Sequence, residues 1–102
     1  MSVRVQCEPF DPWQVLAAHR ADAGLAGKYG ATTVFVGTLR DFNQGQAVSG
    51  MTLEHYPGMT ERQLERLCSE ARNRWNILDV LVVHRYGPLD PNEAIVLVAV
   101  WA

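Results

Sequence analysis

The sequence of 102 residues contains a single lysine, two cysteines and no long hydrophobic run, and each shortage excludes a class of protein. With Lys28 as the only lysine and a net charge of −2, the chain lacks the basic surface that binds duplex nucleic acid. Its longest apolar runs have about eight residues, far fewer than the roughly 20 that cross a bilayer. Polar and apolar residues alternate at the N-terminus, where a secretory signal would be continuously apolar. We therefore expect a cytoplasmic protein that binds neither nucleic acid nor membrane.

The cysteines and histidines give no metal-binding pattern. Cys7 and Cys68 are far apart and form no CxxC pair, so we expect two buried free thiols and no structural zinc. His19, His55 and His84 come from separate segments, and a structural role is the more common one for such isolated residues. Metal ligation by these three is the alternative, although no spacing supports it. The GxGxxG, Walker and GxSxG motifs are absent as well.

The composition, with 48% hydrophobic and 20% charged residues, is typical of a globular protein. The length predicts one folded domain over residues 1–102. Apolar periodicity predicts an α+β fold with two main helices on a mostly antiparallel sheet, in the order β-α-β-β-α-β-β. The predicted strands are residues 3–7, 31–36, 48–56, 79–86 and 94–101. The predicted helices are residues 12–21 and a helix of about 15 residues that begins at Thr60.

Both predicted helices carry start signals. Asp11 precedes Pro12, which is the order of an N-cap and a proline at the first helical position. Thr60 and Gln63 fit a capping box for the second helix. That helix has one predicted apolar stripe, which consists of Leu64, Leu67, Cys68, Ala71 and Trp75. Residues 41–46 and 87–92 read as turns or loops, and the second turn accounts for the acidic residues that flank it, Asp90 and Glu93.

Arg40 is the one candidate binding residue that the pattern itself singles out. It follows an apolar strand, just past Gly37, at the mouth of a polar loop. An arginine at a strand end can present its planar fork to a phosphate or a carboxylate. An arginine on the surface without a ligand is the alternative. Arg85 lies at the end of another strand and could bind an anion in the same way, but a surface role is its simpler interpretation.

Several segments, in the right order, resemble the large, catalytic subunit of molybdopterin synthase, the MoaE-type family. Residues 35–45, FVGTLRDFNQG, are similar to the family loop F-x-G-x-[VL]-R-x-x-N-x-G. The other matching segments are LEHYPGMTE at 53–61, EARNRW at 70–75, HRYGPL at 84–89 and the final strand with Glu93. The resemblance extends from about Gly30 to Val100, and its several motifs together are far more specific than any one of them.

This resemblance implies an α/β hammerhead fold and a sulfurtransferase of molybdenum cofactor biosynthesis. The family converts cyclic pyranopterin monophosphate into molybdopterin, with both dithiolene sulfurs arriving as a thiocarboxylate on a small ubiquitin-like subunit. It assembles as a heterotetramer, a central homodimer of large subunits with a small subunit at each end. For this chain the resemblance implies that Thr38, Leu39 and Arg40 bind substrate, with Arg40 on the phosphate.

The catalytic residues of the family do not match any residue of this sequence. In the family two lysines follow the final strand, whereas this sequence stops at Ala102 and Lys28 matches neither lysine. We therefore assign no catalytic residue, metal or cofactor, and we expect a C-terminally incomplete chain that is inactive by itself. The alternatives are a shortened, non-catalytic homologue that dimerises and binds a partner, and an unrelated metal-binding domain.

We also expect a homodimer from the residues themselves. The final strand and residues 80–83 are more apolar than a small monomer with exposed strand edges should tolerate, and a second copy would cover them.

Overall fold

The computed structural model describes residues 1–43, 45–47 and 49–102. These residues form two helices, α1 (Pro12–Asp22) and α2 (Met59–Arg74). The long strands are β1 (Ser2–Gln6), β2 (Thr32–Thr38), β6 (Asp79–Arg85) and β8 (Ala94–Trp101). The short strands are β3 (Phe42–Asn43), β4 (Gln46–Ala47), β5 (Met51–Leu53) and β7 (Gly87–Leu89). Among the described residues, no helix is long and apolar enough to cross a membrane.

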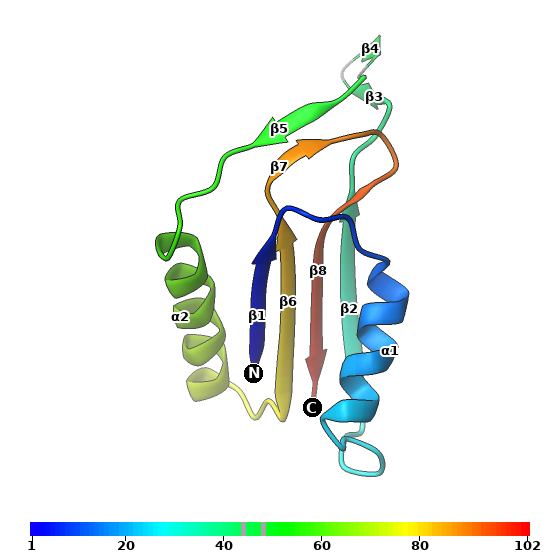
Figure 1. Cartoon of the computed structure of the whole chain (residues 1–102). Helices are drawn as coiled ribbons and strands as arrows, with labels where there is room; N and C mark the ends of the chain where they lie inside the picture. The colour runs from blue at the N-terminus through cyan, green and yellow to red at the C-terminus, as the bar shows by residue number, and fades with distance from the viewer. Residues whose placement is uncertain (44, 48) are drawn as a thin grey trace.

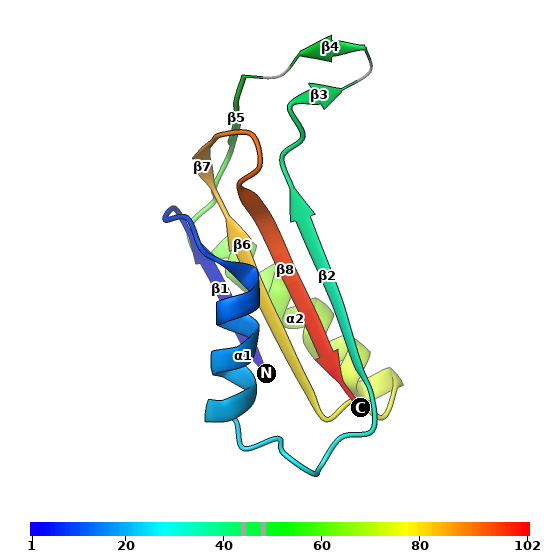
Figure 2. The same cartoon turned by 90° about the vertical axis from the view of Figure 1, so that its right-hand side faces the viewer.

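The four long strands form one sheet in the order β1-β6-β8-β2 (Figure 1). β8 pairs antiparallel with both β6 and β2, and β1 pairs parallel with β6. The helices cover opposite faces of this sheet, with α1 in front and α2 behind in the view of Figure 2. The prediction of an α+β fold with two helices on a mostly antiparallel sheet is confirmed.

Alternation along the strands divides the core between the two faces of the sheet. The buried residues on the α1 face are Leu25, Leu81, Val83, Leu97, Ala99 and Trp101. On the α2 face, Val80 and Val82 pack against Cys68. Because β6 lies between two strands and under two helices, its side chains are buried on both faces, which is why residues 80–83 read as a continuous apolar run.

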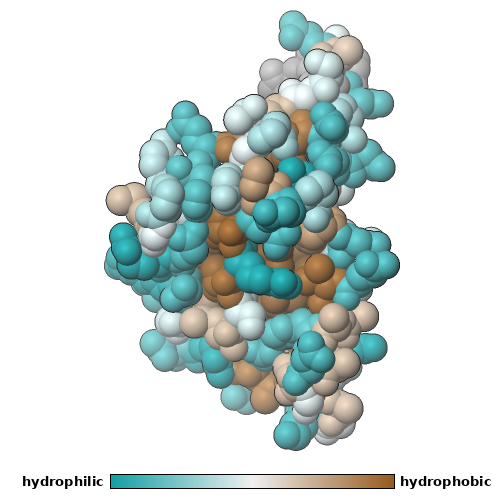
Figure 3. All heavy atoms as spheres, viewed as in Figure 1, coloured by the Kyte–Doolittle hydropathy of each residue, from teal (hydrophilic) through white to brown (hydrophobic). Residues whose placement is uncertain are grey.

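The central position of β6 and β8 corrects one prediction. Both strands are internal, and the edges of the sheet are β1 and β2, so exposed edges at residues 80–83 and 94–101 are not a reason for dimerisation. Apolar surface is exposed elsewhere. Phe35 of β2, opposite Val98 of β8, is 61% exposed. Figure 3 shows further hydrophobic side chains in the hollow between the helices, on the side where β1 forms the edge.

The short strands correct two further predictions. Only Met51–Leu53 of the predicted strand 48–56 is a strand, and Val48 lies outside the described residues. Its partner β7 lies inside the predicted turn 87–92. Pro88 is compatible with this pairing because a two-stranded sheet leaves one side of each strand without a ladder. The predicted loop 41–46 contains β3 and the start of β4, and its residue Gln44 lies outside the described residues.

The helices begin with different caps. The Asp11 carboxylate accepts hydrogen bonds from Trp13 N and Gln14 N, which confirms the predicted start of α1. The N-cap of α2 lies two residues earlier than predicted, at Gly58, which has φ of 79° and donates its N–H to Glu61 at 2.6 Å. The predicted cap of Thr60 and Gln63 is therefore wrong.

The predicted apolar stripe of α2 is correct only in part. Cys68 is buried and Leu64 is half-buried against the sheet, but Leu67 and Trp75 are 61% and 58% exposed. Trp75 follows the last residue of α2, and Leu67 lines an open groove beside the sheet.

Asp79 joins four elements at the lower end of the sheet. Its Oδ1 accepts from the Met1 ammonium at 2.7 Å, and its Oδ2 lies 2.7 Å from His19 Nε2. His19 in turn stacks on the buried Trp101. Burial alone would raise the pKa of the Asp79 carboxyl, but the hydrogen bonds from Met1, His19 and Val80 N–H outweigh it and lower that pKa. His19 therefore has a structural role.

Asp79→Asn should lower the free energy of unfolding at pH 7 by about 3 kcal/mol, because it leaves the part-buried Met1 ammonium without its anion and the His19 ring without its carboxylate partner. The folded-state pKa of Asp79 lies below its ordinary value, so its stabilisation is complete near neutral pH and is lost as the pH falls through that pKa, below about 4. Urea titrations at several pH values should show the two proteins converging in acid. Asp22→Asn, at an exposed site on α1, is the control, and a constant difference from pH 7 to pH 3 would contradict the assignment.

Candidate functional site

The three predicted substrate-binding residues lie at the upper end of β2, where its pairing with β8 becomes irregular. The register shifts between Gly37 and Thr38. A Cβ at position 37 would lie 3.0 Å from Val96 Cγ1, so glycine permits this close approach. Beyond the shift, Leu39 N donates to Glu93 O at 3.1 Å and Leu39 O accepts from Asn92 N at 2.7 Å. These bonds tie the end of β2 to the turn that precedes β8.

Thr38, Leu39 and Arg40 line one cleft of about 520 Å³ together with Asp41, Pro91 and Asn92. The structure thus brings the predicted residues together. Thr38 and Arg40 are exposed and Leu39 is half-buried by its contacts with the turn. The Arg40 guanidinium and the Thr38 hydroxyl come from the end of β2 and the Asn92 amide from the turn, beside the Asp41 carboxylate. The first three groups can bind an oxyanion.

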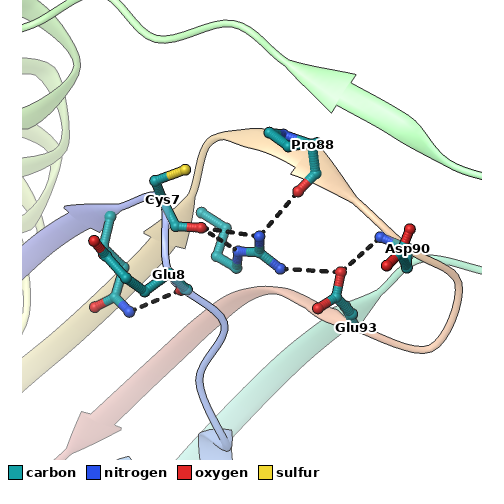
Figure 4. Close-up of polar contacts among 7 residues, drawn as sticks. Cys7, Glu8, Pro88, Asp90 and Glu93 are labelled. Atoms are coloured by element: carbon teal, nitrogen blue, oxygen red, sulfur yellow. Dashed lines mark hydrogen bonds and ion pairs between the residues drawn. The ribbon is translucent and has the colours of Figure 1, made fainter.

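Arg85 fixes the other wall of this cleft from inside the protein. Its side chain is only 4% exposed, so the interpretation as a surface arginine is wrong. Nε and Nη2 donate to Cys7 O at 3.1 and 2.9 Å, and Nη2 also donates to Pro88 O at 2.9 Å (Figure 4). Nη1 forms an ion pair with Glu93 Oε1 at 3.3 Å. One guanidinium therefore holds the end of β1, strand β7 and the start of β8.

Glu93 transmits this anchoring to the turn. Its Oε1 accepts from Asp90 N at 2.6 Å, which closes the turn 90–93 (Figure 4). The pKa of the Glu93 carboxyl is lowered, first by that hydrogen bond and then by Arg85. The turn accounts for Asp90 and Glu93, as predicted, but Glu93 has the additional role of pairing with a buried cation. Because residues 81, 83 and 85 share a face of β6, strand alternation could have placed Arg85 in the interior.

The remaining candidate residues are not brought together. His55 stacks on Tyr86 with ring centroids 4.0 Å apart, and His84 Nδ1 lies 2.8 Å from Arg85 O. In the part of the chain that the structure describes, no three His, Cys, Asp or Glu side chains are arranged to hold a metal ion. Cys68 is buried, and burial raises the pKa of its thiol, whereas Cys7 is only half-buried. Both cysteines are free.

The fold is α+β, and a cleft lined by Thr38, Leu39 and Arg40 lies at the end of its edge strand. Comparison with known proteins agrees with the resemblance seen in the sequence. Residues 5–102 match the family model described as MoaE protein, so the chain belongs to the MoaE protein family. A molybdopterin synthase catalytic subunit from Pseudomonas aeruginosa is 50% identical over 99 residues, which are 96% of this chain and 63% of that protein.

Solved structures share the fold. The molybdopterin cofactor biosynthesis protein E from Burkholderia multivorans is 48% identical with a TM-score of 0.81, over 99% of this chain and 63% of that one. A chain from the complex of subunits 1 and 2 of the molybdopterin-converting factor of Helicobacter pylori has a TM-score of 0.77 over 98% of this chain and 64% of that one. It is 19% identical, so the likeness shows the fold alone. This chain spans less than two thirds of the length of these proteins.

Arg85→Met should destabilise the protein by about 2–3 kcal/mol, because it leaves the half-buried Glu93 carboxylate and two part-buried carbonyl oxygens without their charged donor. Arg85→Lys should recover only part of this loss, since an ammonium cannot reach three acceptors in the fork geometry. Urea unfolding measures both variants. Arg72→Met, at an exposed position on α2, should change stability by less than about 0.5 kcal/mol. A loss below about 1 kcal/mol for Arg85→Met would show that the guanidinium is not a structural anchor.

Proposed function

We propose that this chain provides the substrate-binding part of a molybdopterin synthase large subunit. The reaction would transfer sulfur from a thiocarboxylated small subunit to cyclic pyranopterin monophosphate and form the molybdopterin dithiolene. The observation that carries the proposal is the cleft of Thr38, Leu39 and Arg40 in a chain that is 50% identical to a molybdopterin synthase catalytic subunit. That name also favours an enzyme over a shortened, non-catalytic module.

In this proposal the cleft binds and orients the substrate, and it supplies no reacting group. The guanidinium of Arg40 can pair with two phosphate oxygens, and the Thr38 hydroxyl can add a hydrogen bond. Holding the phosphate at the rigid end of β2 fixes the position of the pterin relative to an incoming sulfur donor. Lys28 lies in the loop before β2, at the opposite end of that strand from Arg40 (Figure 1), so we assign it no role in the cleft.

We further propose two protein partners, a ubiquitin-like small subunit and a second copy of this chain. The name catalytic subunit, carried by the Pseudomonas relative, supports the first partner because it implies a further subunit. Exposed apolar surface supports the second. Phe35 and Leu67 are each 61% exposed on the face of the sheet that α2 covers only in part. Leu67 and other side chains of α2, β6 and β8 line an apolar groove of about 270 Å³.

Arg40→Ala should weaken binding of cyclic pyranopterin monophosphate roughly 10- to 100-fold, because a charge-assisted contact contributes about 1.5–3 kcal/mol. Arg40→Lys should restore only part of the affinity. Calorimetric titration measures affinity, and a melting curve should show little change because Arg40 is exposed. Unchanged affinity, or a loss explained by unfolding, would remove Arg40 from the proposed site.

Sedimentation equilibrium at micromolar concentration should give the mass of a dimer. Phe35→Glu should shift the protein to monomer, because it would place a charge in an apolar interface. Ala21→Glu, at an exposed site on α1 and so on the opposite face of the sheet, should leave the dimer intact. A wild-type monomer would refute the homodimer, and a dimer that tolerates Phe35→Glu would move the interface to another surface.

A further inference from the structure

A second cleft adjoins the Arg40 cleft and shares two of its residues. Its volume is about 460 Å³, and Thr38 and Asn92 line both clefts. The second cleft is otherwise formed by the segment that leads into α1 and by the start of β8, including Phe10, Trp13 and Glu93. The two clefts therefore meet at the end of β2, and a ligand longer than one cleft could occupy both.

The wall of the second cleft presents an aromatic surface that the fold does not use. Trp13 is 61% exposed, although its backbone is held in place by the hydrogen bond from Trp13 N to Asp11. Pro12 precedes it at the first helical position, so the backbone here is restrained twice. Phe10, by contrast, is half-buried against the α1 core. An indole that is exposed, on a fixed backbone and beside a cleft is suited to stacking on a flat ring.

Glu93 gives this cleft a fixed acceptor. The ion pair with Arg85 and the hydrogen bond from Asp90 N both fall on Oε1. These contacts orient the carboxylate, and the lowered pKa of Glu93 keeps it ionised at neutral pH. A carboxylate accepts hydrogen bonds and donates none. Its other oxygen, Oε2, can therefore accept from a ring edge that carries N–H donors, such as the 2-amino and N3–H groups of a pterin.

We propose that the two clefts form one bipartite site, in which the cleft of Phe10, Trp13 and Glu93 takes the pterin ring while Arg40 takes the phosphate. This inference rests on the proposed function and adds ring-recognition residues to it. Trp13 stacks on the ring, Glu93 accepts from its amino edge, and Thr38 with Asn92 lies at the junction. Shape and stacking select a flat heterocycle, and the carboxylate selects a pterin over a lumazine, which has an oxygen in place of the 2-amino group.

The test uses stable probes, namely neopterin monophosphate, neopterin and inorganic phosphate. Trp13→Ala should lower the affinity for both pterins about tenfold, which is the effect of losing one stacked ring, and should leave the affinity for phosphate unchanged. Arg40→Ala should lower the affinity for neopterin monophosphate and for phosphate, but not the affinity for neopterin. Trp75→Ala is the matched control, since Trp75 is 58% exposed but lies at the end of α2. Calorimetry gives the affinities, and melting curves confirm that each variant is folded.

The indole N–H signals of the three tryptophans supply an independent readout. Neopterin should shift the signal of Trp13 and leave those of Trp75 and the buried Trp101 in place. In the wild type, 6-hydroxymethylpterin should bind at least about tenfold more tightly than its lumazine counterpart, because the lumazine presents an acceptor to Glu93.

The outcomes separate this inference from the proposed function. If Arg40→Ala lowers the affinity for neopterin monophosphate while Trp13→Ala leaves the affinities for both pterins unchanged, the ring site is wrong and the phosphate site stands. If Trp13→Ala lowers the affinity for both pterins and Arg40→Ala has no effect on binding, the ring site stands and the Arg40 assignment is wrong. If the wild type binds neither pterin, both are overturned.

Discussion

The buried guanidinium of Arg85 is the contact on which the upper half of the molecule depends. It holds carbonyl oxygens from the end of β1 and from β7, and it pairs with Glu93 at the start of β8. Glu93 closes the turn, and the turn is hydrogen-bonded to Leu39 at the end of β2. The geometry of the surface cleft is thus set by a charge that has almost no exposure to solvent. Such a group must keep all its partners, because a buried charge without them is costly.

Local pattern predicted the elements of the main sheet well. Apolar alternation and β-branched runs located β1, β2, β6 and β8, and the cap at Asp11 located α1. Local pattern did not predict which strands pair, because strand pairing depends on contacts between residues that are distant in the sequence. Strand β7 was missed because it lies in the segment 87–92, which is rich in proline and glycine. The internal position of β6 and β8 could not be read from their hydrophobicity, which is equally consistent with a covered edge.

Two kinds of information led to the candidate site. The strand-end position of Arg40 is a local signal, and the resemblance to the MoaE-type family added Thr38 and Leu39. All three line one cleft. The interpretation of Arg85 as a surface residue is wrong because Arg85 shares a buried face of β6 with Leu81 and Val83. The wall that contains Trp13 required the approach of residues 9–13 to residues 92–94, and no pattern in one sequence encodes that distance.

The strand order also constrains the sequence of events in folding. β8 comes last among the strands along the chain and lies between β6 and β2, so β2 has no partner in the main sheet until β8 has been synthesised. Only the parallel pair of β1 and β6, itself joining residues that are far apart, can form earlier. On the ribosome the emerging chain therefore carries β2 with both edges unpaired until residues 39–93 and then β8 have been synthesised. Such a strand is a natural target for chaperones and for aggregation.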